Sequence, residues 1–288
     1  MPTPAHLFIT GATGNVGGAA LRCLLTQRPA GAELTAATRE PVNDRQGVGM
    51  SAAAEVNLVP FDFTKPETVA PALRGVTGLL PVRPPAIGDV TRYLKPVVQA
   101  AAAGVSHIVF LSLQGAQYNP FVPHHRVEGY LKYSGIRYSL LRPSFFMQNL
   151  NTTHRDDIRR HNQLLLSAGH ASFVDAADVG AAAAQLLLNL PAASAGYELT
   201  GRDALTYDEV AAQLSAVLGR PKAGIRAFRA YECAKGTPPA LVNVMTGIYS
   251  AARLGLAAHV LPVLAELLGR EPGTLRAFRE RERVCRLP

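Results

Sequence analysis

The sequence predicts an α/β protein with a doubly wound parallel sheet of the Rossmann type and a smaller, mostly helical C-terminal substrate domain. Three observations carry this prediction. Short β-rich runs alternate with helical stretches through the first half of the chain, a glycine-rich turn follows the first of those runs, and the alternation ends after Arg142. Because consecutive parallel strands need a crossover, usually a helix, between them, the alternation favours a parallel sheet covered on both faces.

The predicted strands are short runs rich in apolar or β-branched residues. The run His107–Leu111 fits a buried parallel strand best, whereas Pro81 weakens the fourth run because proline removes a donor from the ladder. The strands are expected over His6–Thr10, Glu33–Thr38, Val56–Pro60, Gly78–Val82, His107–Leu111 and Arg137–Leu141, with helices over Asn15–Gln27, Pro66–Leu73, Asp89–Ala103 and Pro123–Ser134.

The second half of the chain reads differently. It predicts an alanine-rich helix over Asp175–Leu190 and a short strand over Tyr197–Thr200. A capping box at Thr206–Glu209 opens a helix that runs from Thr206 to about Leu218. Two further helices are expected over Leu241–Leu254 and Leu256–Leu268. We therefore expect a dinucleotide-binding domain over residues 1–152, to which 171–190 returns, a substrate domain over 153–288, and a cleft between them.

Composition limits the classes of function. The 288 residues are 48% hydrophobic and 17% charged, which suits a folded core, and the net charge of +8 favours anionic partners. Arginines crowd the last stretch, but glutamates alternate with them, so we interpret it as a solvated helix face and expect no nucleic-acid partner. Three distant cysteines, no leader pattern and no membrane-length apolar run predict a soluble, cytoplasmic protein without a metal site or membrane contact.

The glycine-rich turn is the sharpest motif. Gly11, Gly14 and Gly17 stand in the spacing G-x-x-G-x-x-G between the first predicted strand and the first predicted helix. Gly11 suits a tight turn, Gly14 lets the backbone approach a pyrophosphate, and Gly17 lets helix and strand pack closely. We expect the intervening residues to line the dinucleotide as well: Ala12, Thr13, Asn15 and Val16.

The second predicted strand ends at Arg39 rather than at an acidic residue. An acidic residue there would accept from a ribose 2′-hydroxyl, whereas a guanidinium pairs with a 2′-phosphate, so the sequence favours NADP over NAD. The alternative is a surface arginine paired with Glu40. Further cofactor contacts are expected at the ends of later strands, from Val82, Pro143 and Phe145.

Several motifs together resemble the atypical short-chain dehydrogenases/reductases, in particular the NmrA-like group. They span almost the whole chain: Thr10–Gly17, Phe61–Phe63, Ser134–Asn149, Phe173–Gly180, Tyr197–Gly201 and Leu267–Pro272. The resemblance implies that Asp62 and Phe63 lie near the adenine. The group includes NADPH-dependent quinone and azo-dye reductases, triphenylmethane reductases, isoflavone and lignan reductases, and regulators that bind dinucleotide without catalysis. It therefore implies a fold and a cofactor class, but not a reaction.

The usual catalytic pair of short-chain dehydrogenases, Tyr-x-x-x-Lys, is missing from the helix after the fifth strand. His124 stands there instead, with Glu128 one turn later, and Ser112 follows the fifth strand. Relatives of the quinone- and azo-reductase kind keep a histidine at this place, so His124 and Ser112 are the catalytic candidates, and Glu128 is expected to raise the pKa of His124. The alternatives are a surface histidine beside His125 and a strand-terminal hydroxyl.

Two functions remain open at this stage. The first is an NADPH-dependent oxidoreductase that passes hydride to a planar apolar acceptor such as a quinone or azo compound, which aromatic residues such as Phe146 and Tyr118 would stack against. The second is a dinucleotide-binding redox sensor without catalysis. Turnover of NADPH with a panel of quinones separates the two. The oligomeric state is also open, with a homodimer as one option.

Overall fold

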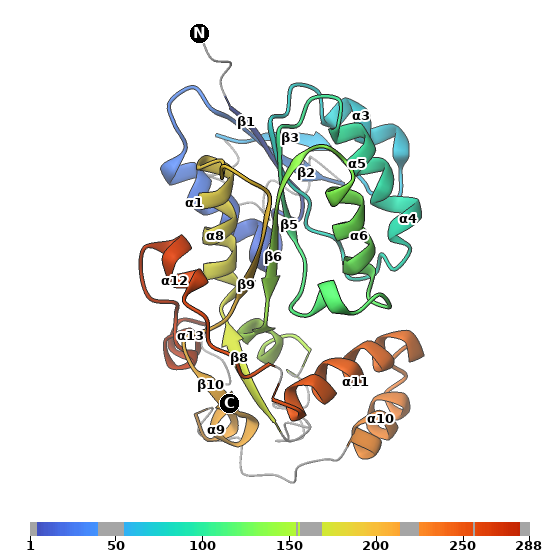
Figure 1. The fold of residues 1–288 in the computed structure, drawn as a ribbon, viewed down its shortest axis with the longest axis vertical. Helices are drawn as coiled ribbons and strands as arrows, with labels where there is room; N and C mark the ends of the chain where they lie inside the picture. The colour runs from blue at the N-terminus through green and yellow to red at the C-terminus, as the bar shows by residue number, and fades with distance from the viewer. Residues whose placement is uncertain are drawn as a thin grey trace. The chain divides into compact units, whose positions relative to one another are not determined.

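The structure, a computed structural model, describes residues 5–39, 55–153, 155, 169–213, 225–255 and 257–282. The chain divides into two compact units (Figure 1), the first made of 1–143 and 176–198 and the second of 144–175 and 199–288. The sequence-based domain limits, 1–152 with 171–190 and then 153–288, stay a prediction. Among the described residues, no helix combines the length and the apolar character that a membrane span requires.

The first unit is built on a seven-stranded sheet of order β3-β2-β1-β4-β5-β6-β9. The pairs from β3 to β6 are all parallel, as predicted, and the order reverses between β1 and β4. In a doubly wound sheet this switch point is where ligands bind, outside the carboxyl ends of the strands. The strands are β1 (His6–Ile9), β2 (Glu33–Thr38), β3 (Asn57–Pro60), β4 (Gly78–Leu80), β5 (His107–Leu111), β6 (Arg137–Pro143) and β9 (Ala195–Leu199).

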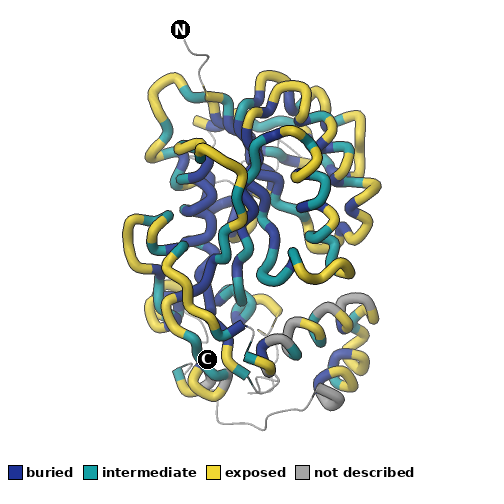
Figure 2. The backbone as a smooth tube through the Cα atoms, viewed as in Figure 1, coloured by how far each residue is buried: buried dark blue, intermediate teal, exposed yellow. Residues whose placement is uncertain are grey.

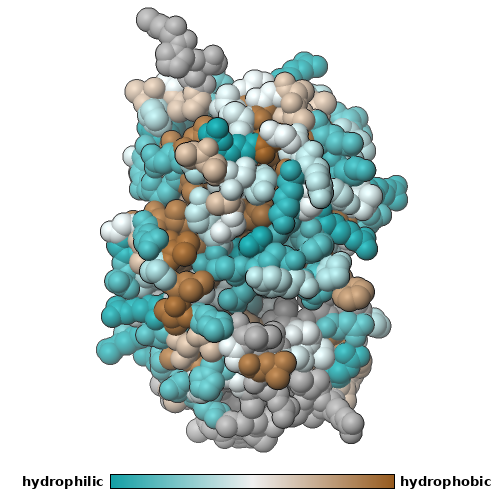
Figure 3. All heavy atoms as spheres, in the orientation of Figure 1, coloured by the Kyte–Doolittle hydropathy of each residue, from teal (hydrophilic) through white to brown (hydrophobic). Residues whose placement is uncertain are grey.

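Helices cover both faces of this sheet (Figure 1). On one face α1 (Asn15–Gln27) packs against α8 (Ala176–Leu188), and on the other lie α3 (Val69–Ala72), α4 (Val90–Tyr93), α5 (Lys95–Ala101) and α6 (Pro123–Lys132). The central strands and the facing sides of α1 and α8 are buried (Figure 2). The surface over α4, α5 and α6 is mostly hydrophilic in the view of Figure 3, as expected for helices that bury one side only.

Two predicted helices of this unit are broken in the structure. The run Asp89–Ala103 forms α4 and α5 with a break at Leu94, and the run Pro66–Leu73 forms a short 3₁₀ turn, Pro66–Thr68, followed by α3. Pro96 accounts for the first break, because its ring lacks an N–H and clashes with the carbonyl four residues earlier. β4 ends at Leu80, before Pro81, one reason being that proline cannot donate to the ladder.

The second unit contains a small sheet of order β10-β8-β7, which the prediction of a mostly helical domain missed. β8 (His170–Val174) pairs parallel with β7 (Phe145–Phe146) and antiparallel with β10 (Ala204–Thr206). Its core includes Met147, Phe173, Phe228 and Phe278. The helices are α9 (Tyr207–Gln213), α10 (Ile225–Ala234), α11 (Pro239–Arg253), α12 (Val263–Leu268) and α13 (Leu275–Glu282), after a 3₁₀ turn at Met147–Leu150.

The predicted helix boundaries of the second unit agree only in part with the structure. The predicted capping box is confirmed, since Thr206 donates to the Glu209 carboxylate and its hydroxyl accepts from the Glu209 amide at 3.1 Å. The expected extension of that helix to Leu218 lies outside the described residues. The helix expected from Leu256 begins only at Val263, because Pro262 keeps the residue before it out of the helical region. The helix α10 was not predicted.

The contact between α1 and α8 leaves no room for a side chain at Gly180. A Cβ there would lie 2.5 Å from Cβ of Ala19 and 2.6 Å from the carbonyl oxygen of Val16. Small residues thus let the two helices approach closely over the sheet.

We expect Gly180→Ala to lower the free energy of unfolding by about 1–3 kcal/mol, because overpacking forces the helices apart. Gly129→Ala in α6 is the matched control, since its Cβ would meet nothing within 4 Å. Alanine is the better helix former, so the control should gain up to about 1 kcal/mol. Urea unfolding of both variants is the measurement, and equal effects would contradict the close contact.

Candidate active site

The glycine-rich turn lies at the carboxyl end of β1, beside the end of β4. The amide of Thr10 donates to the carbonyl of Leu80, and its hydroxyl donates to the carbonyl of Val82, both at 3.0 Å. Gly11 adopts φ of +65°, in the left-handed region, and its carbonyl accepts from the amide of Gly14 at 2.9 Å. The contacts of Thr10 therefore hold the turn at the switch point, and Gly11 supplies the left-handed backbone conformation that the turn needs.

The three glycines of the turn have distinct constraints. A Cβ on Gly17 would lie 2.3 Å from the carbonyl oxygen of Gly11, so only glycine fits there without displacing the turn. A Cβ on Gly14 would lie 3.2 Å from the same oxygen, which is tight but can be accommodated by a small shift. Gly14 is also the N-cap of α1, and no side chain caps the helix. The first amides of α1 are thus left for an anion, as a pyrophosphate requires.

Arg39 and Asp62 follow neighbouring strands, β2 and β3. Arg39 is exposed. Burial raises the pKa of the Asp62 carboxyl, but hydrogen bonds from Thr64 and the charges of Lys65 and Arg39 outweigh this and hold the pKa below its usual value. The side chain of Phe63 packs edge-on against Phe61 inside the core. Any contact of Phe63 with an adenine is therefore left to its backbone.

The helix α6 carries a buried acid where sequence reasoning placed the catalytic group. Glu128 is 1% exposed and accepts from Ser112 Oγ at 2.6 Å. Arg142, near the end of β6, donates to both carboxylate oxygens of Glu128, from Nε at 2.9 Å and from Nη2 at 2.7 Å. Burial raises the pKa of Glu128, but the hydrogen bonds and charge of Arg142 hold the pKa below its ordinary value, so Glu128 stays ionised.

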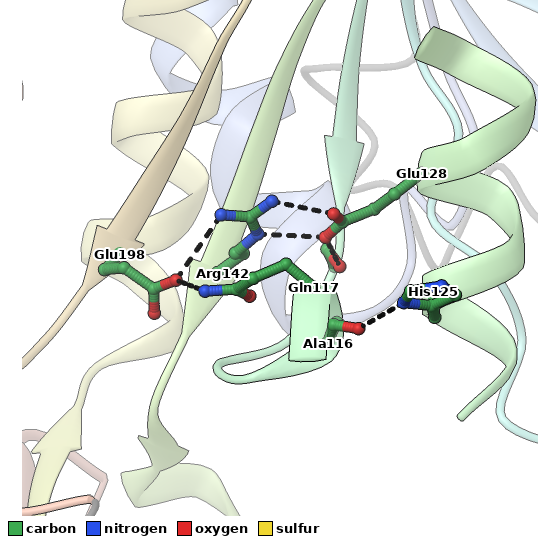
Figure 4. A network of polar contacts seen from close by, with 7 residues as sticks. Ala116, Gln117, His125, Glu128, Arg142 and Glu198 are labelled. Atoms are coloured by element: carbon green, nitrogen blue, oxygen red, sulfur yellow. Dashed lines mark hydrogen bonds and ion pairs between the residues drawn. The ribbon is translucent and has the colours of Figure 1, made fainter. Parts of the chain in front are cut away.

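The network continues from Arg142 to the edge strand β9 and back to the turn before α6. Nη1 of Arg142 lies 3.5 Å from Glu198, which accepts from Gln117 Nε2 at 2.8 Å (Figure 4). A Cβ on Gly196 would lie 2.7 Å from Nη1, so the glycine makes room for the guanidinium. The hydroxyl of Ser112 donates its hydrogen to Glu128. The catalytic role expected of Ser112 stays a prediction.

His124 lies in the first turn of α6, and its ring centroid is 6.2 Å from that of Phe110 in β5. Its Nε2 is 3.4 Å from Nη2 of Arg83, which follows β4. Burial and the charge of Arg83 lower the pKa of His124 to about 4. The charge of Glu128 raises this pKa, as expected, but burial and the charge of Arg83 outweigh it, so the pKa is lowered overall.

His125 has a different environment. Its Nδ1 donates to the carbonyl oxygen of Ala116 at 2.8 Å and ties α6 to the preceding turn (Figure 4). A substitution of His125 therefore removes a structural contact.

The remaining predicted cofactor residues differ in their positions. Val82 is half-buried beside the glycine turn, where its side chain would lie 3.2 Å from a Cβ on Gly11. Pro143 ends β6, and its carbonyl accepts from the amide of Gln114 at 3.0 Å. Phe145 belongs to the second unit, in β7, with its ring 6.0 Å from that of Phe173. The contact of each with a cofactor stays a prediction.

Sequence reasoning missed Arg83, Glu198 and the pairing of Arg142. The signal for Arg83 was its place in the loop after β4, the strand that flanks the switch point on one side. The signal for Arg142 was weaker, because its partner Glu128 is distant in sequence and its second partner lies on the edge strand.

Comparisons with known proteins agree with this architecture. The model of the NmrA-like family matches residues 4–227. The chain is 30% identical to NAD(P)H azoreductase of Xenophilus azovorans, covering 94% of this chain and 96% of the relative. It is 30% identical to quinone oxidoreductase 2 of Escherichia coli, covering 74% and 75%. The crystal structure of an NADPH-dependent quinone oxidoreductase of Escherichia coli complexed with NADPH superposes with a TM-score of 0.83 at 26% identity, covering 96% of this chain and 99% of that one.

The glycine turn yields a test that separates folding from binding. We expect Gly17→Ala to lower the free energy of unfolding by about 1–3 kcal/mol, because its methyl group collides with the Gly11 carbonyl. Gly14→Ala should leave unfolding nearly unchanged and weaken dinucleotide binding, because its methyl group stands where the phosphates approach. Urea unfolding and calorimetric titration with NADPH measure the two effects. If Gly14→Ala binds normally, the phosphate site lies elsewhere.

Proposed function

The chain belongs to the NmrA-like family, and on that premise we propose that it is an NADPH-dependent oxidoreductase that passes hydride to a planar, apolar acceptor of the quinone or azo class. The observation that carries the proposal is the glycine turn with the uncapped N-terminus of α1 at the switch point of the sheet. NAD(P)H-dependent oxidoreduction is further supported by the azoreductase and quinone oxidoreductase relatives, which align over most of the chain.

The proposed cofactor is NADPH. Its pyrophosphate would be held by the first amides of α1, which no side chain caps, and by the backbone of the turn at Gly11–Gly14. Its 2′-phosphate would be held by Arg39, which is exposed just after β2. The adenine would lie near Asp62, beyond the end of β3.

The bound cofactor supplies a hydride, and the chain's residues orient the acceptor. Hydride addition to a quinone gives the hydroquinone monoanion, which one proton from water converts to the hydroquinone. No strong acid is needed, so the absence of Tyr-x-x-x-Lys from α6 is compatible with this reaction. His124 would serve as a neutral hydrogen-bond donor to the acceptor oxygen, because a pKa of about 4 leaves the ring uncharged near neutral pH.

The direct test is oxidation of NADPH by the purified chain with a panel of neutral quinones and azo dyes. Acceptor-dependent oxidation is expected. If NADPH binds and no acceptor in a broad panel is reduced, a dinucleotide sensor replaces the enzyme.

We expect Arg39→Ala to weaken NADPH binding by about 1.5–3 kcal/mol and to leave NADH binding unchanged, because the lost bond is charge-assisted and specific to the 2′-phosphate. Arg74→Ala removes the same charge from another exposed position of the first unit and serves as the control. Calorimetric titrations with both cofactors decide it. Equal losses for NADPH and NADH would refute the role of Arg39.

We expect His124→Ala to lower the kcat for quinones about 3- to 10-fold, the value of one neutral hydrogen bond, with little change in NADPH affinity. The pH profile of kcat between pH 6 and 9 should be the same in the variant and the parent, because the ring is neutral throughout this range. Stopped-flow kinetics over that range provide the measurement. An inflection near pH 6.5 that disappears in the variant would show that His124 titrates as an acid instead.

A further inference from the structure

Arg83 is a mostly buried cation without an anionic partner among the described residues. It follows β4 at the switch point, and burial lowers the pKa of its guanidinium with no opposing charge. A buried charge that lacks a counter-ion is costly, and proteins usually pair such groups. This unpaired guanidinium lies in the first unit, at the same edge of the sheet as the glycine turn.

The hydrogen bonds of Arg83 are unevenly distributed over its three nitrogens. Nη1 donates to the carbonyl oxygens of Ile87 at 2.5 Å and Pro84 at 3.1 Å, which hold the side chain in place. Nη2 meets only Nε2 of His124, at 3.4 Å, and Nε is buried without a partner among the described residues. The edge formed by Nε and Nη2 is therefore poorly satisfied.

In Arg142, which belongs to the same unit, the Nε–Nη2 edge of the guanidinium binds a carboxylate. Its Nε and Nη2 bind the two oxygens of Glu128 at 2.9 and 2.7 Å. This is the bidentate geometry that suits a carboxylate or a similar oxyanion. The corresponding edge of Arg83 has an imidazole nitrogen in place of an oxyanion.

The imidazole itself has an unsatisfied donor. A guanidinium can only donate, so Nε2 of His124 accepts, and the hydrogen of the neutral ring is on Nδ1. Nδ1 is buried and has no partner among the described residues. Two adjacent side chains thus each leave a buried donor unused, at a typical cost of about 1–3 kcal/mol for each group.

We propose that Arg83 is a specificity-determining residue whose Nε–Nη2 edge binds an oxyanion of the acceptor, after the ring of His124 turns aside. The movement exposes the guanidinium edge and frees Nδ1–H of His124 to donate to the same ligand. The inference rests on the proposed reductase function. The oxyanion is either an acidic substituent of the acceptor, such as a sulfonate, or the phenolate oxygen that hydride addition creates.

Binding is the first test, because it does not depend on turnover. Naphthalene-2-sulfonate and the uncharged naphthalene-2-sulfonamide have nearly the same shape, and calorimetric titration with and without NADP⁺ compares them. The sulfonate should bind about tenfold more tightly or better, in line with a charge-assisted hydrogen bond. Arg83→Gln should abolish this preference. Arg126→Gln, which removes an exposed charge from α6, should retain it.

Kinetics with 1,4-naphthoquinone and its 2-sulfonate then identify the source of the oxyanion. A raised KM for the sulfonate alone in Arg83→Gln assigns the acidic substituent, and a lowered kcat for both quinones assigns the phenolate that forms in the reaction.

Either kinetic result, or the loss of the sulfonate preference in binding, supports the site. Unchanged binding and kinetics in Arg83→Gln, or equal effects in Arg126→Gln, would overturn it, as would a loss confined to NADPH affinity. If the parent chain reduces neither quinone but its sulfonate binding depends on Arg83, the reductase proposal fails and the oxyanion site stands.

Discussion

The close approach of backbone to backbone around α1 is the constraint on which the first unit depends. Gly17 brings the first turn of α1 against the carbonyl of Gly11, and Gly180 brings α8 against the same helix. Neither position has room for a Cβ. The same closeness points the helix N-terminus at the switch point of the sheet, so packing and phosphate recognition are set by one arrangement. A substitution at Gly17 changes stability and binding together. A substitution of Gly14 is expected to weaken binding and to leave stability nearly unchanged, because a Cβ there needs only a small shift.

A buried ion pair between Glu128 and Arg142 joins α6, the helix after the fifth strand, to β6. Glu128 is stabilised as an anion by both edge donors of Arg142 and by Ser112, so the region offers a rigid, charge-balanced support and no acid. Removing one partner would leave the other charge buried and unpaired, at a cost larger than the pair contributes. The pair joins α6 to β6 and thereby fixes the start of α6, where His124 lies.

Sequence patterns predicted the features that depend on residues close together in the chain. The glycine turn, the helix Asn15–Gln27, the strand His107–Leu111 and the Thr206 capping box depend on neighbouring residues and were predicted at or near their observed limits. The contacts between side chains far apart in sequence, such as that of Arg142 with Glu198, could not be predicted from these patterns. Glu128 does raise the pKa of His124, as predicted, but the pKa is lowered overall, because burial and the charge of Arg83, which lies far from His124 in sequence, outweigh Glu128. Arg83 was missed because its lack of a counter-ion is visible only once its surroundings are assembled.

The contrast between Arg142 and Arg83 extends the argument from fold to specificity. Both guanidinium groups belong to residues at the carboxyl ends of parallel strands, Arg83 after β4 and Arg142 near the end of β6. Arg142 is neutralised by a carboxylate, whereas Arg83 is held against a neutral imidazole. A chain that needed Arg83 only for packing would satisfy its donors at little cost with a carboxylate, as it does for Arg142. An unsatisfied cation beside an unsatisfied neutral donor is instead suited to a ligand that brings its own negative oxygen. If that oxygen is the phenolate formed by hydride addition, the site would favour the reduced, anionic form of the acceptor over its neutral form, which is the preference that speeds hydride transfer. If it is an acidic substituent, the site would select acceptors that carry one.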